Sequence, residues 1–160
     1  MNGMVNTLPI LLITCLYIMV LLLIIGVDLH QRRILNKVTL PGTLVALLIS
    51  LAYGWQPFFL ALLGALIGFL VFYGLFWWGG RKYGPGALGF GDVKLAMLLG
   101  AMLGLQHILF TLALGMLLAG LAAILLILAG PANQKRTLPF GAYLAAAGVV
   151  MLVWTSIVSL

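Results

Sequence analysis

Hydrophobic residues run along this chain in long uninterrupted stretches rather than in an alternating or amphipathic pattern. The stretches cover residues 8–27, 38–54, 57–78, 92–105, 107–129 and 139–159. An apolar run of about 20 residues can cross a bilayer as a helix, because each residue adds about 1.5 Å and the hydrocarbon core is about 30 Å thick. The pattern therefore predicts an all-α integral membrane protein with about six transmembrane helices.

The composition agrees with lipid as the main solvent of the chain. Hydrophobic residues make up 65% of the 160 residues and charged residues 6%, whereas a soluble domain is about half apolar and about a quarter charged. We therefore expect residues 1–160 to form a single polytopic membrane domain. The one cysteine, Cys15, excludes an internal disulfide and a thiolate metal cluster.

Basic residues are almost confined to alternate connections between the apolar stretches. Seven of the eight Lys and Arg residues lie in the first, third and fifth connections (residues 28–37, 79–91 and 130–139), and Lys94 follows shortly after the third. Short cationic loops stay in the cytoplasm. We therefore expect these connections to be cytoplasmic and the N-terminus to lie outside. The net charge of +6 thus reflects membrane topology rather than nucleic-acid binding.

Glycines and one short stretch add expectations about packing. Gly64 with Gly68, and Gly100 with Gly104, form GxxxG pairs that favour close helix packing. A helix over residues 92–105 would rise only about 20 Å, which is short for a bilayer. The glycine-rich loop before it could enter the membrane, the bilayer could be thinner there, or the helix could be longer.

The only acidic residues, Asp28 and Asp92, both lie where an apolar stretch meets a basic connection. Acids at a membrane are costly and are functional candidates. Structural roles stay open for each, as an N-cap for Asp92 and as a partner of Arg32 for Asp28. Two carboxylates that share a site can also activate water, one as base and one as protonated acid. We predict that they form a catalytic pair for peptide hydrolysis.

Three short stretches around these acids carry more specific information. Residues 89–94 are GFGDVK, residues 28–36 are DLHQRRILN, and residues 139–144 are PFGAYL. They resemble the GxGDxK motif, the first-aspartate motif and the PFGPxL stretch of the bacterial type IV prepilin leader peptidases, which are GxGD-type membrane aspartic proteases. The departures are Leu35 and Ala142, where the family usually has Pro. Both lie outside the acid positions, so we expect them to affect loop conformation rather than chemistry.

Four further residues are candidates for supporting or substrate-binding roles. Gly89 and Gly91 would let the backbone bend toward a substrate and let Asp92 approach its partner. Lys94 would tune Asp92, with a snorkelling cation as the alternative. Asn36 would orient a carboxylate or a substrate carbonyl, with a turn or capping role as the alternative.

The resemblance implies an aspartic endopeptidase that removes the short basic leader from prepilins or pseudopilins. It would act at the cytoplasmic face of the bacterial inner membrane, for a type IV pilus or a type II secretion system. Its partners would be the substrate helix and membrane lipid, with no nucleic acid. Many members also methylate the new N-terminus through a region with paired CxxC motifs. With Cys15 alone, this chain is expected to be a peptidase-only form without zinc, S-adenosylmethionine or another cofactor.

The main alternative is a small proton- or ion-coupled transporter subunit in which Asp28 and Asp92 carry protons. Such proteins tend to place ionisable groups near the bilayer midplane, between inverted repeats. Both acids here lie at one predicted face, and no internal repeat is apparent in the sequence. The pattern therefore favours the peptidase.

Overall fold

The computed structural model describes residues 2–31, 36–84, 89–129 and 139–159, and almost all of them are helical. The helices are α1 (Asn2–Gln31), α2 (Asn36–Ala52), α3 (Trp55–Tyr83), α4 (Phe90–Leu128) and α5 (Phe140–Ser159). α1, α3, α4 and α5 each contain a stretch long and apolar enough to cross a membrane, and α2 is a shorter apolar helix. The all-α, multi-pass membrane character is therefore confirmed. The count of six spans and their orientation stay predictions.

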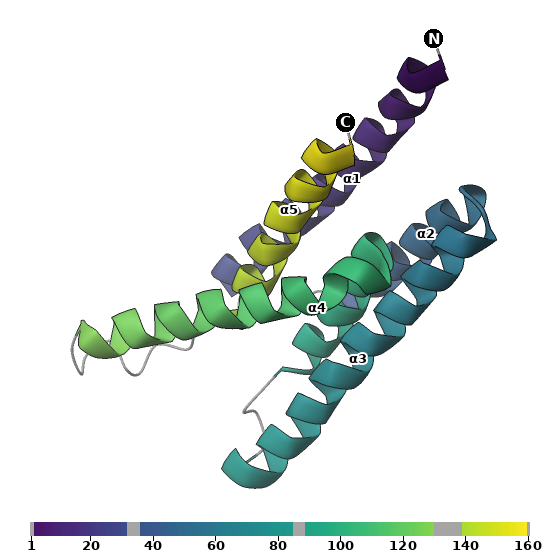
Figure 1. Ribbon diagram of the computed structural model, residues 1–160. Coiled ribbons are helices and arrows are strands. Elements are labelled where there is room, and N and C mark those ends of the chain that lie inside the picture. Colours follow the sequence, from purple (N-terminus) through teal and green to yellow (C-terminus); the bar gives the residue numbers. More distant parts are fainter. Residues whose placement is uncertain (1, 32–35, 85–88, 130–138, 160) are drawn as a thin grey trace.

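α4 is broken at Gly104, whose φ of 71° and ψ of 178° lie outside the helical region. Glycine adopts a positive φ readily because it has no Cβ to clash with the backbone. The break divides α4 into residues 90–103 and 105–128, and the chain changes direction there (Figure 1). These halves correspond to the fourth and fifth apolar stretches. The connection between these two stretches is a single non-helical residue, Gly104, because residues 105–107 are helical.

The first half of α4 forms the buried centre of the molecule. Its side chains are enclosed on several faces, as the full burial of Val93, Leu95, Ala96, Leu98 and Leu99 shows. α4 packs most extensively on α3 and also contacts α5 and α2, whereas α1 packs mainly on α5 (Figure 1). A helix of about 21 Å is compatible with this position, because protein rather than lipid surrounds it.

α3 and α4 approach each other closely where both lack side chains. A Cβ on Gly64 would overlap the carbonyl oxygen of Gly100, and a Cβ on Gly100 would overlap that of Gly64. One turn along α3, Gly68 faces the carbonyl oxygen of Ala96 in the same way. The close packing that the GxxxG pairs predict is confirmed at Gly64, Gly68 and Gly100.

Candidate active site

Asp28 lies in the last turn of α1 and is only 5% exposed. It continues a stripe of buried side chains, Tyr17, Leu21 and Ile24. Residues three and four apart lie on one face of a helix. Asp28 therefore lies on the buried face of α1, and its carboxylate faces the interior of the protein.

The opening turn of α5 binds this carboxylate. Ala142 donates its backbone N–H to Asp28 Oδ2 at 2.7 Å, and the same N–H lies 3.2 Å from the Pro139 carbonyl oxygen. The first N–H groups of a helix lie at the positive end of its dipole, and the last turn lies at the negative end. The start of α5 thus compensates for the position of Asp28 at the end of α1. Residue 142 was expected to affect loop conformation rather than chemistry; its amide contacts an acid directly, and its effect on the reaction stays a prediction.

Asp92 lies in the first turn of α4 and is 8% exposed. Gly89 is the N-cap residue of this helix, so an N-cap role for Asp92 itself is wrong. The Gly89 backbone N–H instead donates to the Asp92 carboxylate, and the Asp92 N–H donates to the Gly89 carbonyl oxygen at 3.1 Å. This reciprocal arrangement resembles a capping box, with Asp92 in the third helical position.

The fold brings Asp28 near enough to Asp92 for its charge to act on the Asp92 carboxylate. Each carboxylate is buried, and each accepts one backbone N–H from the start of a different helix. Like charges that close in a poorly solvated site favour a state in which one carboxyl is protonated and the other is ionised. Such a pair can hold and activate a water molecule.

The supporting candidates Gly89, Gly91 and Lys94 have different surroundings in the structure. A Cβ on Gly89 would lie 3.2 Å from Asp92 Oδ2, so glycine leaves room for the carboxylate there. Gly91 lies in the first turn of α4, and the Lys94 ammonium lies 5.0 Å from the centre of the Phe90 ring, a cation–π distance. The functional roles of these residues stay predictions.

Other expectations fall outside the part of the chain that the structure describes. Asn36 begins α2, but the structure does not describe its side chain. Arg32 and Leu35 lie outside the described residues. The loop expected to enter the membrane includes residues 85–88, which also lie outside the described ranges.

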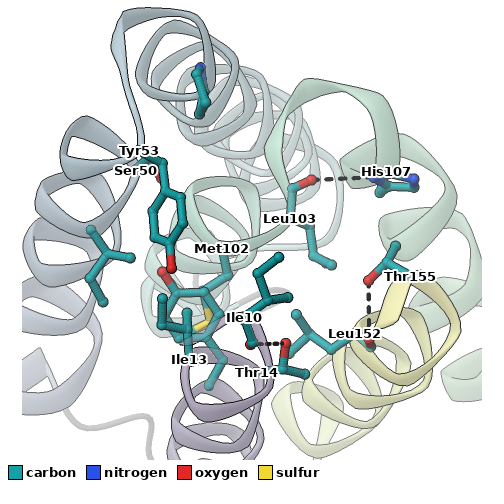
Figure 2. A pocket seen from close by; sticks show the side chains of 13 residues that line it. Ile10, Ile13, Thr14, Ser50, Tyr53, Met102, Leu103, His107, Leu152 and Thr155 are labelled. Carbon is teal, nitrogen blue, oxygen red and sulfur yellow. Dashed lines mark hydrogen bonds between the residues drawn. The ribbon is translucent and has the colours of Figure 1, made fainter. Parts of the chain in front are cut away.

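A cavity of about 330 Å³ lies elsewhere, between α1, α2, α4 and α5 (Figure 2). Tyr53 projects into it, and His107 Nδ1 lies 3.4 Å from the Leu103 carbonyl oxygen at its edge (Figure 2). Along α1 and α4, its lining residues Tyr17 and Met102 lie about three helical turns from the acids. This cavity is therefore distinct from the carboxylate pair.

Comparison with known proteins places the acids within a matched region. The chain matches the Type IV leader peptidase family over residues 15–125. It is 37% identical to a prepilin leader peptidase/N-methyltransferase of Aeromonas salmonicida (strain A449), over 84% of this chain and 46% of the relative. Proteins of the same name from Aeromonas hydrophila and Pseudomonas putida are 36% and 32% identical, over 84% and 80% of this chain and 47% and 44% of their own lengths. The chain spans about half the length of these curated relatives. No solved structure matches it.

Proposed function

The chain belongs to the type IV leader peptidase family, and from this premise we propose that it is a membrane aspartic endopeptidase. Its substrates are prepilins or pseudopilins, from which it removes the short basic leader. The observation that carries the proposal is that Asp28 and Asp92 are both buried and that the charge of Asp28 acts on Asp92. The relatives' printed name, prepilin leader peptidase, supports the substrate class.

In the proposed reaction, a water molecule lies between the two carboxyl groups. The ionised carboxylate takes a proton from the water as its oxygen attacks the scissile carbonyl carbon, and the protonated carboxyl hydrogen-bonds to the carbonyl oxygen. Collapse of the tetrahedral intermediate breaks the carbon–nitrogen bond, and the departing amine receives a proton from the pair. One water is consumed for each bond cleaved.

The proposed orientation places the pair at the cytoplasmic face of the bacterial inner membrane. Asp28, Asp92 and Ala142 adjoin the first, third and fifth connections, which carry most of the positive charge. The hydrogen bond from Ala142 to Asp28 and the electrostatic effect of Asp28 on Asp92 support a common end for the three basic connections. With the break at Gly104, α4 contributes two of the six proposed spans. Residues 1–160 form one peptidase domain in this proposal.

The test is cleavage of a prepilin that carries a short basic leader, by wild type, Asp28→Asn and Asp92→Asn in detergent. Both substitutions preserve size and keep one acceptor oxygen but remove the acid, so kcat/KM is expected to fall by about 10³-fold or more. Ser50→Ala is the polar control, because this hydroxyl lies by the distant cavity and bonds only to the Ala46 carbonyl oxygen among the described contacts.

Thermal unfolding in detergent must show that each variant is folded. Cleavage at more than a tenth of the wild-type rate by a folded Asp28→Asn or Asp92→Asn protein would refute the catalytic pair. If wild type cleaves no prepilin but conducts protons in liposomes, and both substitutions abolish that proton flux, the transporter alternative replaces the peptidase.

A further inference from the structure

α3 carries two phenylalanines, one turn apart, that pack against the first residues of the two helices flanking the acid pair. The Phe72 ring centre lies 5.9 Å from that of Phe140, the first residue of α5, at an interplanar angle of 44°. The Phe76 ring centre lies 5.6 Å from that of Phe90, the first residue of α4, at 67°. Both are distances and angles at which aromatic rings attract each other. We call these four residues the aromatic brace.

The brace belongs to the rigid part of the molecule. Phe72 is fully buried, and Phe76 is half-buried and packs against the core. Residues four apart lie on one face of a helix, so a single face of α3 reaches both helix starts. α3 is itself held against α4 by the close contact of Gly64 with Gly100. The brace therefore has little freedom to shift relative to α4.

Both helix starts carry the backbone amides that bind the carboxylates. The Ala142 N–H, which bonds to Asp28 Oδ2 at 2.7 Å, lies two residues after Phe140. The Gly89 N–H, which bonds to Asp92, lies one residue before Phe90. A shift of either first turn would therefore move the carboxylate attached to it.

Asp28 depends on this arrangement more than Asp92 does. Asp92 is part of α4 itself, whereas Asp28 belongs to α1, which packs mainly on α5. The position of Asp28 relative to Asp92 is therefore set through α5, which packs directly on α4. The contact between Phe140 and Phe72 adds a link from the first residue of α5 to α3.

We propose that Phe72 and Phe76 are positioning residues for the carboxylate pair, acting through the first turns of α5 and α4. This inference rests on the proposed peptidase function for its role in cleavage. Reacting groups must be held within a fraction of an ångström, and a misplacement of about 1 Å can cost about 10²-fold in rate. Loosening the brace should therefore slow the chemical step rather than weaken substrate binding.

The kinetic test compares Phe72→Leu and Phe76→Leu with Phe69→Leu. Phe69 is the control, because it is half-buried on the same helix and stacks on Tyr73, with ring centres 5.5 Å apart, rather than on a first-turn residue. It reaches the brace only indirectly, through the Tyr73 ring, whose centre lies 6.4 Å from that of Phe76. We expect kcat to fall by about tenfold in each brace variant, with KM changed by less than about twofold. Equal kcat losses in Phe69→Leu, or a change in KM alone, would overturn the proposal.

A second test needs no cleavage. The midpoint of thermal unfolding in detergent is measured for Phe72→Leu in the wild-type and Asp28→Ala backgrounds, with Phe69→Leu in both as control. If the brace acts on Asp28 through α5, the shift caused by Phe72→Leu will be smaller in Asp28→Ala, by about 2 °C or more, while the control shifts will add. If Phe72→Leu does not fold, Phe76→Leu with Asp92→Ala forms the equivalent cycle.

The two tests separate the inference from the function on which it rests. Additive shifts in the unfolding cycle would overturn the brace even if wild type cleaves prepilin. If the unfolding shifts are non-additive but the wild-type protein cleaves no prepilin, the brace is supported and the peptidase is refuted.

Discussion

Each carboxylate of the acid pair accepts a hydrogen bond from a backbone N–H. Gly89 supplies the donor for Asp92 and Ala142 the donor for Asp28. A backbone donor does not depend on residue type, except that proline has none. The role of position 142 was therefore invisible in the sequence, where Ala142 differs from a proline-containing motif and suggests only a change in the loop.

Replacing Gly89 with alanine tests how closely the backbone fits Asp92. The new Cβ would lie 3.2 Å from Asp92 Oδ2, so the carboxylate must move by a few tenths of an ångström. We expect kcat for prepilin cleavage to fall by about tenfold and the unfolding midpoint to change by less than about 3 °C.

Gly80→Ala is the control for this substitution, because a Cβ at Gly80 meets nothing within 4 Å. Wild-type kcat in Gly89→Ala, or an equal loss of kcat in Gly80→Ala, would show that the fit at Gly89 is unimportant.

Two glycines give helix α4 its close contact with α3 and its change of direction. Gly100 lets its first half lie directly against α3, and Gly104 breaks it so that its second half takes a new direction (Figure 1). The sequence identified both glycines as a packing pair. Only the structure separates them into a contact residue and a break, because both roles use the absence of a Cβ and leave the same trace in the sequence.

Alanine at Gly64 or Gly100 should destabilise the protein strongly. The added Cβ would overlap a backbone carbonyl oxygen of the opposite helix, and backbone cannot move aside as a flexible side chain can. We expect the free energy of unfolding to fall by about 2–4 kcal/mol for each substitution. Unfolding by SDS titration in mixed micelles measures this quantity.

Gly74→Ala provides the matched control in α3, since a Cβ there meets nothing within 4 Å. It is expected to change stability by less than about 1 kcal/mol, in the stabilising direction, because alanine favours helix. A loss in Gly74→Ala as large as that in Gly64→Ala would contradict the packing explanation.

At the scale of the whole molecule, a buried polar site lies inside a strongly apolar exterior. Large side chains such as Leu12, Leu117 and Leu128 are 63%, 59% and 76% exposed, as expected of surfaces that face lipid. The acids come from segments far apart in the sequence and meet beside the basic connections. An end rich in positive charge also suits a site that works at the cytoplasmic face.

Single-cysteine labelling tests this orientation. In a Cys15→Ser background, Lys37→Cys places a thiol at the start of α2, and Gln56→Cys places one at the start of α3; both positions are exposed. Spheroplasts treated with a membrane-impermeant maleimide should label Gln56→Cys readily and Lys37→Cys only after the membrane is permeabilised. The reverse pattern would invert the proposed topology.

The sequence alone determined the solvent of this protein, its helical class and the identity of its two acids. Continuous apolar runs permit only helices here, and two acidic residues in a chain of 160 leave a single possible pair. The tertiary structure decided how the acids are held. The amide of Ala142, the ring of Phe72 and the break at Gly104 act through contacts between distant segments. Such contacts leave no local pattern where nearly every residue is apolar, because the periodicity that marks an inward face in a soluble helix is absent.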